Sequence, residues 1–204
     1  RADEVQRVFK SGMHSRKIGS HVTKGQWKGM PIFTLSLEER ATCPRSCRHW
    51  LDCYGNKMNW SARLQPGAEL IAAIEREIKE LSQKHRAGFV VRLHVLGDFY
   101  SSDYAHFWLG LLHDYRLLRI YGYTAWGPST EIGTVIQTMN RQQPERCYLR
   151  FSDGPSGYLR TVSVEEASQA GIAIVCPAQT DKTDCCGTCA LCWSTDRAIA
   201  FLTH

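Results

Sequence analysis

The sequence has no long apolar run, no internal repeat and no segment rich in Gly, Pro or Ser. A membrane span needs about 18 or more consecutive apolar residues, and no stretch approaches that length. Because no linker or low-complexity tract divides the 204 residues, we expect one main domain. With 43% hydrophobic and 22% charged residues, the composition excludes a disordered tail, a collagen-like fibre and a coiled coil.

Acidic residues are scarce at the amino-terminal end of the chain. Residues 1–30 hold seven Lys or Arg and only two acidic residues, so the whole formal net charge of +5 arises there. We therefore expect a basic amino-terminal arm over residues 1–30 and a single α/β domain over residues 31–204. Such an arm can bind DNA or RNA, because each neutralised phosphate releases condensed counterions. The alternative is a solvated terminus without a ligand.

Cysteine is the residue type in excess. Eight of the nine cysteines fall in two runs, and Cys147 stands alone between them. Secreted disulfide frameworks favour short chains with dispersed, paired cysteines, and a chain of this size can bury a core without them. We therefore expect a cytoplasmic setting in which the two runs bind metal. Cys147 is interpreted as an ordinary buried thiol.

Hydrophobic patterning alternates between the strand period and the helix period. Strands are predicted at 31–37, 89–96, 118–124, 147–151 and 172–175. Helices are predicted at 66–85, 101–113, 129–141, 163–170 and 194–201. Short connections between these elements predict an α/β fold with a mainly parallel sheet, or a partial (β/α) barrel, of about five strands.

Functional groups of parallel α/β folds collect beyond the carboxyl ends of the strands. The first and the last predicted strand each lead into one of the two cysteine runs. The second strand leads into Gly97 and Asp98, the third ends at Tyr123, and the fourth ends next to Asp153. We therefore expect cysteine-rich loops and two carboxylates to share the carboxyl-terminal rim.

Cationic side chains occur within strands that should be apolar. Arg92 and His94 alternate with apolar residues in the second strand, Arg119 lies in the third and Arg150 in the fourth. Because buried parallel strands are normally near-continuous apolar runs, this pattern predicts a cationic cavity for an anionic substrate. The alternative is that these arginines pair with acidic residues inside the protein or reach solvent.

The remaining cysteines have spacings typical of metal ligands. The predicted ligands are Cys43, Cys47, Cys53, Cys176, Cys186, Cys189 and Cys192. The Cys-x2-Cys-x2-Cys spacing of the second run is close to that of bacterial ferredoxins, which favours a [4Fe–4S] cluster. Zinc is the alternative, although zinc ribbons normally have two separate Cys-x2-Cys knuckles. One or two clusters are expected, and Cys185 is a possible substitute for Cys186.

Several separated motifs resemble one family. The motifs are T-C-P-R-S-C, R-L-H-V-L-G-D-F-Y-S-S-D-Y, Y-G-Y-T-A-W and V-C-P-A-Q followed by C-x2-C-x2-C-W. Over about residues 30–193 they are similar to the gene product 88 domain of phages and prophages. If the chain is phage-encoded, the expected location is the cytoplasm of the host cell.

The order of two motifs is also loosely similar to radical S-adenosylmethionine enzymes. The resemblance lies in the three-cysteine loop after the first strand and in Gly97-Asp98 after the second. It implies a [4Fe–4S] cluster with one open iron, and S-adenosylmethionine as a further cofactor. The second gap of the loop is five residues here, where those enzymes have two.

Two function classes follow from these patterns. The first is a cluster-dependent, radical-S-adenosylmethionine-like enzyme acting on a nucleotide or nucleic acid, in which Asp98 orients the ligand and Tyr123 or Asp153 moves protons. In that enzyme Arg92, His94, Arg119 and Arg150 would bind the anionic substrate. The second is a non-enzymatic nucleic-acid-binding or partner-binding protein stabilised by iron–sulfur or zinc. The oligomeric state is left open.

Overall fold

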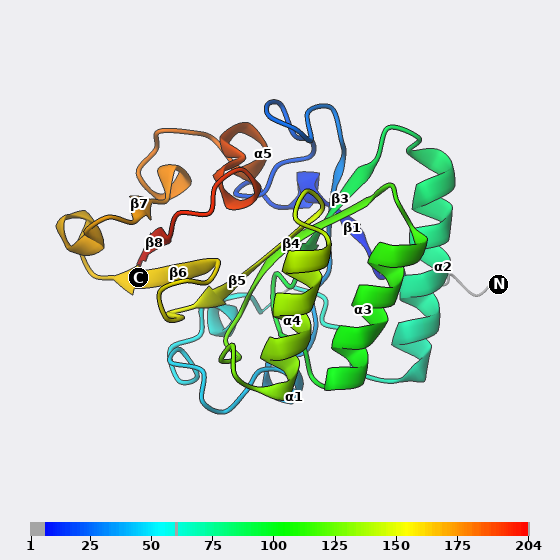
Figure 1. Cartoon of the computed structure of the whole chain (residues 1–204), viewed down its shortest axis with the longest axis horizontal. Helices are drawn as coiled ribbons and strands as arrows, with labels where there is room; N and C mark the ends of the chain where they lie inside the picture. Colours follow the sequence, from blue (N-terminus) through cyan, green and yellow to red (C-terminus); the bar gives the residue numbers. More distant parts are fainter. Residues whose placement is uncertain (1–6, 60, 204) are drawn as a thin grey trace.

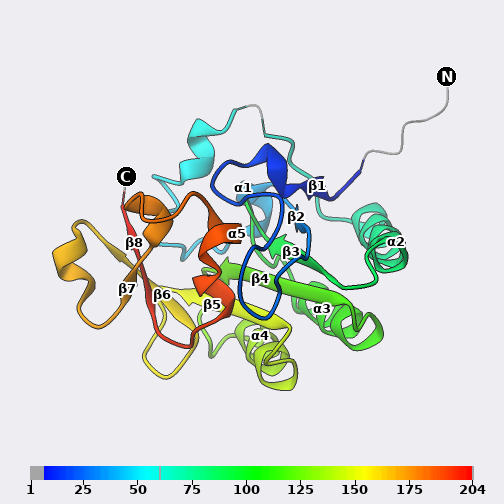
Figure 2. The ribbon, with the colours of Figure 1, turned by 90° about the horizontal axis from the view of Figure 1, so that it is seen from above.

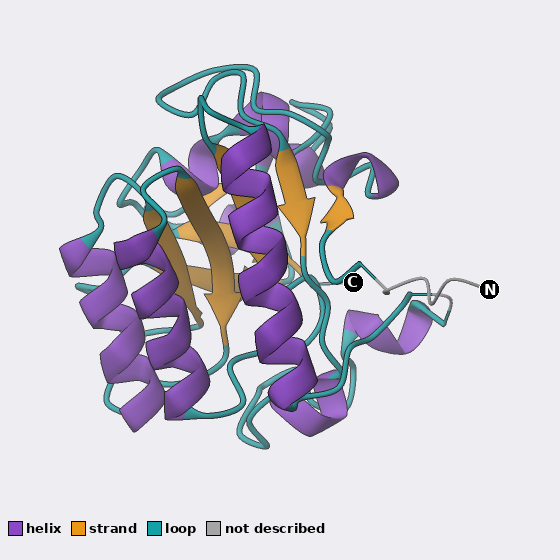
Figure 3. Cartoon of the chain, turned by 90° about the vertical axis from the view of Figure 1, so that its right-hand side faces the viewer, coloured by secondary structure: helices purple, strands orange, loops and turns teal. Residues whose placement is uncertain are grey.

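The computed structural model describes residues 7–59 and 61–203. Its centre is an eight-stranded sheet, with three long helices against one face and two irregular segments against the other. Figure 3 shows the helix layer from the side. The fold is therefore α/β with a largely parallel sheet, as the alternating pattern predicts.

The strands of the sheet are β1 (Lys10–Ser11), β2 (Ile32–Thr34), β3 (Phe89–Leu93), β4 (Leu118–Thr124), β5 (Cys147–Ser152), β6 (Arg160–Val164), β7 (Ile174–Val175) and β8 (Ile199–Leu202). Their order is β1-β2-β3-β4-β5-β6-β8-β7, so β1 and β7 are the two edges. β1 pairs antiparallel with β2, and the other pairs are parallel. The carboxyl ends of the parallel strands therefore share one side of the molecule.

The helices are α1 (Glu39–Thr42), α2 (Ala68–Lys84), α3 (Ser102–Asp114), α4 (Glu131–Gln142) and α5 (Cys186–Cys189). α2 forms because apolar residues at helical spacing, Leu70 to Leu81, give it one buried stripe. The Ser101 hydroxyl caps α3 by accepting from the Tyr104 N–H, as predicted. The Thr130 hydroxyl caps α4 by accepting from the Gly133 N–H, one residue after the start of the helix predicted at 129–141.

Two predicted helices are wrong. Residues 160–164 form β6, and only Ala167–Ala170 make a short 3-10 turn, capped by Glu166 rather than by Ser163. The Ser163 N–H and hydroxyl instead bind the Asp153 carboxylate, at 2.6 and 3.1 Å. The expected helix at 194–201 is replaced by β8, which inserts between β6 and β7. The sheet also has more than the expected five strands, because these short strands depend on pairing partners distant in sequence.

The face of the sheet opposite the helices is covered by both ends of the described chain. Apolar residues from the amino-terminal segment, among them Val22, Trp27 and Met30, are buried there with Ile32 and Trp193. Trp27 and Trp193 stack with ring centroids 5.2 Å apart. Residues 7–30, part of the expected basic arm, therefore contribute to the core. Among the described residues, no helix combines the length and apolar character needed to cross a membrane.

Candidate functional site

The first cysteine run forms a loop between α1 and the 3-10 turn Tyr54–Lys57. Cys43 follows the last residue of α1, and Cys53 precedes the 3-10 turn. Burial raises the pKa of the Cys43 thiol, and the nearby Asp98, Cys47 and Cys53 raise it further. The three thiols, Cys43, Cys47 and Cys53, therefore lie near one another and near Asp98. We call them the three-thiol group.

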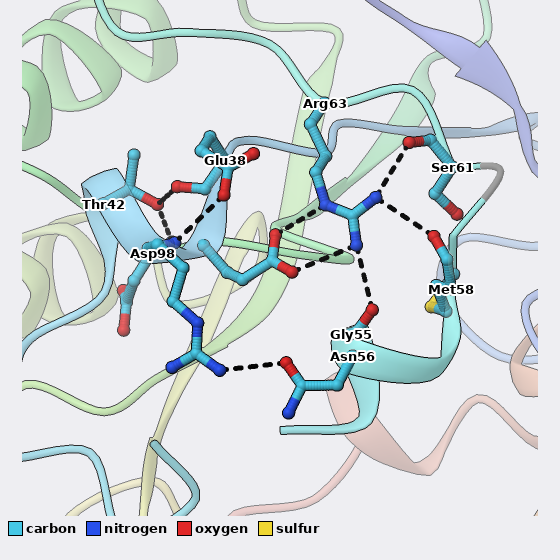
Figure 4. Close-up of polar contacts among 10 residues, drawn as sticks. Glu38, Thr42, Gly55, Asn56, Met58, Ser61, Arg63 and Asp98 are labelled. Atoms are coloured by element: carbon cyan, nitrogen blue, oxygen red, sulfur yellow. Dashed lines mark hydrogen bonds and ion pairs between the residues drawn. The ribbon is translucent and has the colours of Figure 1, made fainter. Parts of the chain in front are cut away.

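A buried ion pair fixes the loop that carries the three-thiol group. The Arg63 guanidinium donates to both carboxylate oxygens of Glu39, at 2.8 and 3.0 Å. It also donates to three backbone carbonyls of the loop, those of Gly55, Met58 and Ser61 (Figure 4). Because the Glu39 and Arg63 side chains are only 9% and 19% exposed, the pair is screened little by water. It holds the loop against α1.

Asp98 connects the ends of two strands to α1. Its backbone N–H donates to the Thr42 hydroxyl at 3.1 Å (Figure 4), and its carboxylate accepts from the Phe99 and Ala125 N–H groups at 2.8 and 2.7 Å. The side chain is buried, which raises its pKa to about 7, although these N–H groups oppose the shift. Because Asp98 is only 2% exposed and both of its carboxylate oxygens accept from backbone N–H groups, it links loops and is closed to a ligand.

The second cysteine run surrounds a small cavity. Cys176, Cys186, Cys189 and Cys192, the four-thiol group, line it with Pro177, Ala178, Leu191 and Ile199. The cavity holds about 10 Å³, the room of about one water molecule. Cys185 does not line it: its sulfur lies 3.6 Å from the Thr188 hydroxyl and next to Gly19. Cys186 and not Cys185 is therefore the candidate ligand.

Polar groups surround the four-thiol group. The Tyr123 hydroxyl lies 2.8 Å from Cys192 Sγ, and burial raises the pKa of Tyr123 well above its ordinary value, so the hydroxyl keeps its proton. Burial raises the pKa of the Cys176 thiol, and hydrogen bonds from the backbone N–H groups of Ala178 and Gln179 to its sulfur oppose that shift. Hydrogen bonds to sulfur of this kind tune iron–sulfur clusters.

Arg150 holds the segment that ends the four-thiol group. Its guanidinium is fully buried and donates to the carbonyls of Cys192 at 3.1 Å and Arg197 at 2.9 Å, and also to those of Arg160 and Thr195. Its donors are thus satisfied by backbone. Arg150 is placed to stabilise this segment, not to contact a substrate.

The amino-terminal segment 17–23 closes the other side of the second cysteine run. The Cys186 N–H donates to the Lys17 carbonyl at 2.9 Å, and the Thr23 N–H donates to the Gly187 carbonyl at 3.0 Å. A Cβ at Gly187 would lie 2.2 Å from the His21 carbonyl oxygen, so only glycine permits this approach. Figure 2 shows the segment beside α5.

Arg92 lies near Cys186 and Cys192 of the four-thiol group, and near Tyr54 and Asp98, which adjoin the three-thiol group. Its guanidinium carbon stands 4.4 Å from the ring centroid of Tyr123 and 5.5 Å from that of Tyr121. Burial lowers the pKa of Arg92, but Tyr123, Tyr121, Tyr54 and Cys186 raise it to a higher net value. Within the described part of the chain, no carboxylate forms an ion pair with Arg92.

The other two predicted cationic residues lie apart from Arg92. His94 packs against Phe99, and its Nε2 lies 3.1 Å from the Tyr104 hydroxyl; burial lowers its pKa to about 3, so it is neutral. Arg119 begins β4, at the end away from Tyr123, and donates to the Arg116 carbonyl at 2.7 Å. The predicted single cationic cavity, with Arg92, His94, Arg119 and Arg150 together, is therefore not observed.

A groove opens where β4 and β5 end. It holds about 330 Å³ and is lined by Ser46, Cys47, Arg48, His49, Ala125, Trp126, Gly127, Pro128, Ser152, Asp153, Gly154 and Pro155. Asp153 was predicted at this rim, and Cys47 brings the three-thiol group to it. Arg48 was missed, because only its position next to a cysteine signals it. We call this cavity the rim groove.

Comparison with known proteins gives one family match. The family model described as Gene product 88 matches residues 9–198. The chain belongs to the Gene product 88 family. Neither the curated proteins nor the solved structures contain a match to it.

In the part of the chain that the structure describes, the thiols of this Gene product 88 chain are not arranged around a metal ion. All nine cysteines are free thiols. Over residues 7–59 and 61–203, no group of three or more His, Cys, Asp or Glu side chains is arranged to hold a metal ion. The four-thiol group nevertheless shares one cavity. Since that cavity is small, its side chains must rotate outward to admit a cluster.

Proposed function

We propose that this Gene product 88 chain is an iron–sulfur protein with two cluster sites, acting as an enzyme on a nucleotide or nucleic acid. The observation that supports this most directly is the gathering of seven thiols, from runs more than 120 residues apart, into two groups, one beside Asp98 and one around a single cavity. Closed four-cysteine sites suit structural or electron-relay clusters, and a three-cysteine site leaves one iron open.

Soft thiolate ligands favour iron–sulfur clusters or zinc over magnesium or manganese. The four-thiol group lines one cavity, which supports a shared metal site for these four sulfurs. When bound there, a cluster supplies one-electron chemistry. Burial raises the pKa of the Cys186 thiol to about 12 and that of Cys47 above its ordinary value, so loading must displace their protons.

The chain's own residues divide the remaining work. The Tyr123 hydroxyl stabilises negative charge on the Cys192 sulfur. Asp98 keeps the three-thiol loop at the ends of β3 and β4. Cys47 brings that group to the rim groove, where a substrate would meet it.

The residues do not fit S-adenosylmethionine in the way that the resemblance to radical enzymes implies. That resemblance implies that Asp98, the residue after Gly97, contacts the amino group of the methionine moiety. Asp98 is instead buried, with both oxygens bound to the Phe99 and Ala125 N–H groups. We derive no step through this cofactor.

Anaerobic reconstitution with iron and sulfide tests the proposal. We expect a brown protein with thiolate-to-iron charge-transfer absorption and matching amounts of iron and sulfide. A colourless protein that contains zinc would contradict it. An S-adenosylmethionine cleavage assay on the loaded protein, expected to be negative, tests the misfit at Asp98.

A second candidate function is a metal-stabilised nucleic-acid-binding protein without catalysis. The exposed part of the three-thiol loop supports it, since Arg40 and Arg45 stand 4.8 and 5.2 Å from the ring centroid of Trp50. Because residues 7–30 contribute buried side chains to the core, the exposed lysines of this segment are replaced one at a time instead of the segment being deleted. Lys24→Gln and Lys28→Gln should each reduce the salt dependence of DNA or RNA binding. Salt-independent binding would exclude this function.

A further inference from the structure

The rim groove lies next to Cys47, one of the candidate metal ligands, and its walls come from three segments. The loop 46–49 carries Cys47, the segment 125–128 follows β4, and the turn 152–155 follows β5. Its volume of about 330 Å³ is at the small end of the usual 300–1,000 Å³ range of ligand pockets. It therefore suits a small ligand or a single unit of a chain.

The cation of the groove is available to a ligand. Arg48 is 65% exposed and forms an ion pair with Asp153 Oδ2 at 3.8 Å, which is longer than a hydrogen bond and leaves its N–H groups open to a ligand. The predicted sheet arginines offer no such group at this rim, because Arg150 is satisfied by carbonyls and Arg119 lies at the far end of β4. An arginine fork of this kind binds phosphate.

The acceptor of the groove is fixed in place. Asp153 adopts a positive φ of 50°, and its two oxygens accept from the Ser163 N–H and hydroxyl. A carboxylate has about four acceptor sites, so two remain for hydroxyl groups of a ligand. His49 Nε2 lies 3.2 Å from the same Ser163 hydroxyl, which joins the two polar walls.

The apolar wall is equally rigid. Trp126 donates its indole N–H to the Phe99 carbonyl at 2.6 Å, and Gly127 and Pro128 follow it into the cap of α4. Aromatic side chains of this kind provide stacking surfaces for bases. The groove thus combines a phosphate-binding cation, a hydroxyl acceptor and an apolar surface.

We infer that the rim groove binds one nucleotide, with its phosphate on Arg48, its ribose hydroxyls on Asp153 and its base against Trp126 and Pro128. This inference rests on the proposed function and names its substrate site. The nucleotide is either a free nucleotide or the end of a nucleic-acid strand, and both present a phosphate, ribose hydroxyls and a base to the groove. The three-thiol group then lies beside it, through Cys47.

Titration calorimetry with nucleoside monophosphates and with a 5′-phosphorylated tetranucleotide tests the inference. Arg48→Gln should weaken binding by about tenfold, the effect of one charge-assisted hydrogen bond, and Arg48→Lys should recover part of it. Arg141→Gln is the matched control, since Arg141 is an exposed arginine that does not line the groove. Tighter binding of the tetranucleotide than of any monophosphate would identify a strand end as the ligand, and the reverse a free nucleotide.

Equal losses in Arg48→Gln and Arg141→Gln would overturn the inference, as would binding of inorganic phosphate as tight as that of a nucleotide. Absence of any nucleotide binding would also overturn it. Iron and sulfide are measured in the same samples, and variants are compared at matched iron content. If protein that contains iron and sulfide binds no nucleotide, only the assignment of the groove is contradicted. If protein that takes up no iron still binds nucleotide, only the proposed iron–sulfur function is contradicted.

Discussion

Single residues decide how the four-thiol group behaves as a ligand set. Cys192 is the most buried of its sulfurs, and it faces the Tyr123 hydroxyl, over whose ring Arg92 lies. Positive charge and hydrogen-bond donors near a cluster stabilise its reduced form, because reduction adds negative charge. The sequence analysis predicts Arg92 as a substrate ligand, but in the structure Arg92 lies beside the four-thiol group.

Tyr123→Phe should leave the iron content unchanged and lower the reduction potential of the cluster by roughly 20–60 mV, the equivalent of one neutral hydrogen bond. A redox titration followed by electron paramagnetic resonance measures this. Tyr158→Phe, in which an exposed ring is changed, is the control. An unchanged potential in Tyr123→Phe would show that the hydroxyl does not act on the cluster.

Asp98 should give the metal-free protein a distinctive pH dependence. Its folded pKa of about 7 lies above the unfolded value, so its contribution to stability is complete below about pH 4 and is lost as the pH rises through 7. His94, with a folded pKa of about 3, acts in the opposite direction below about pH 6.5. The two effects therefore largely cancel between pH 4 and 6.5.

Asp98→Asn removes one side of this balance. The free energy of unfolding of the variant should rise between pH 4 and 6.5, whereas that of the unmodified protein stays nearly flat there and falls toward pH 8. Urea unfolding at several pH values measures both. Parallel curves for the two proteins would mean that Asp98 is already ionised in the folded state at low pH.

At the scale of elements, the sequence predicts what is periodic and misses what depends on distant partners. α2, α3 and α4 and the strands β3 to β5 were predicted because each has its own apolar pattern, and the structure confirms them. β6 and β8 were missed because their few residues are held by each other, with Thr161 opposite Ile199. Ser163 carries a capping signal, but Asp153 binds it first.

The three-thiol loop depends on the Glu39–Arg63 pair. Arg63→Gln should lower the free energy of unfolding by roughly 2–3 kcal/mol, somewhat less than for a fully buried pair, and should reduce iron uptake at this loop. Arg7→Gln, which removes the exposed ion pair with Glu80, should leave unfolding unchanged. Denaturant unfolding compares the two, and equal effects would contradict a special role for the buried pair.

The second cysteine run depends on close backbone approach. Gly187→Ala should displace segment 17–23, because the added Cβ meets the His21 carbonyl, and should reduce iron at the four-thiol group while sparing the other site. Gly110→Ala in α3 meets nothing within 4 Å and should stabilise the protein by up to about 1 kcal/mol. Thermal unfolding and iron analysis of both variants measure this; retention of iron by Gly187→Ala would contradict it.

At the scale of the whole molecule, the two cysteine runs lie in different surroundings. The first follows β2 along the chain, and its Cys43 lies near Asp98, which follows β3. The second lies against the open face of the sheet, where Cys186 and Cys192 meet Tyr121 and Tyr123, and residues 17–23 hold it there. No local pattern foretells that the two ends of the chain meet, since their contacts are long-range backbone bonds and core packing.

The central claim is that the thiols form two separate cluster sites. It is tested most directly by the number of iron atoms per chain in matched cysteine variants. After anaerobic reconstitution the unmodified chain should hold about eight iron and eight sulfide atoms, as two [4Fe–4S] clusters do. Replacing Cys43, Cys47 and Cys53 by Ala, or separately Cys176, Cys186, Cys189 and Cys192, should each leave about half of that. Loss of all iron in either variant, or zinc in place of iron, would contradict the account.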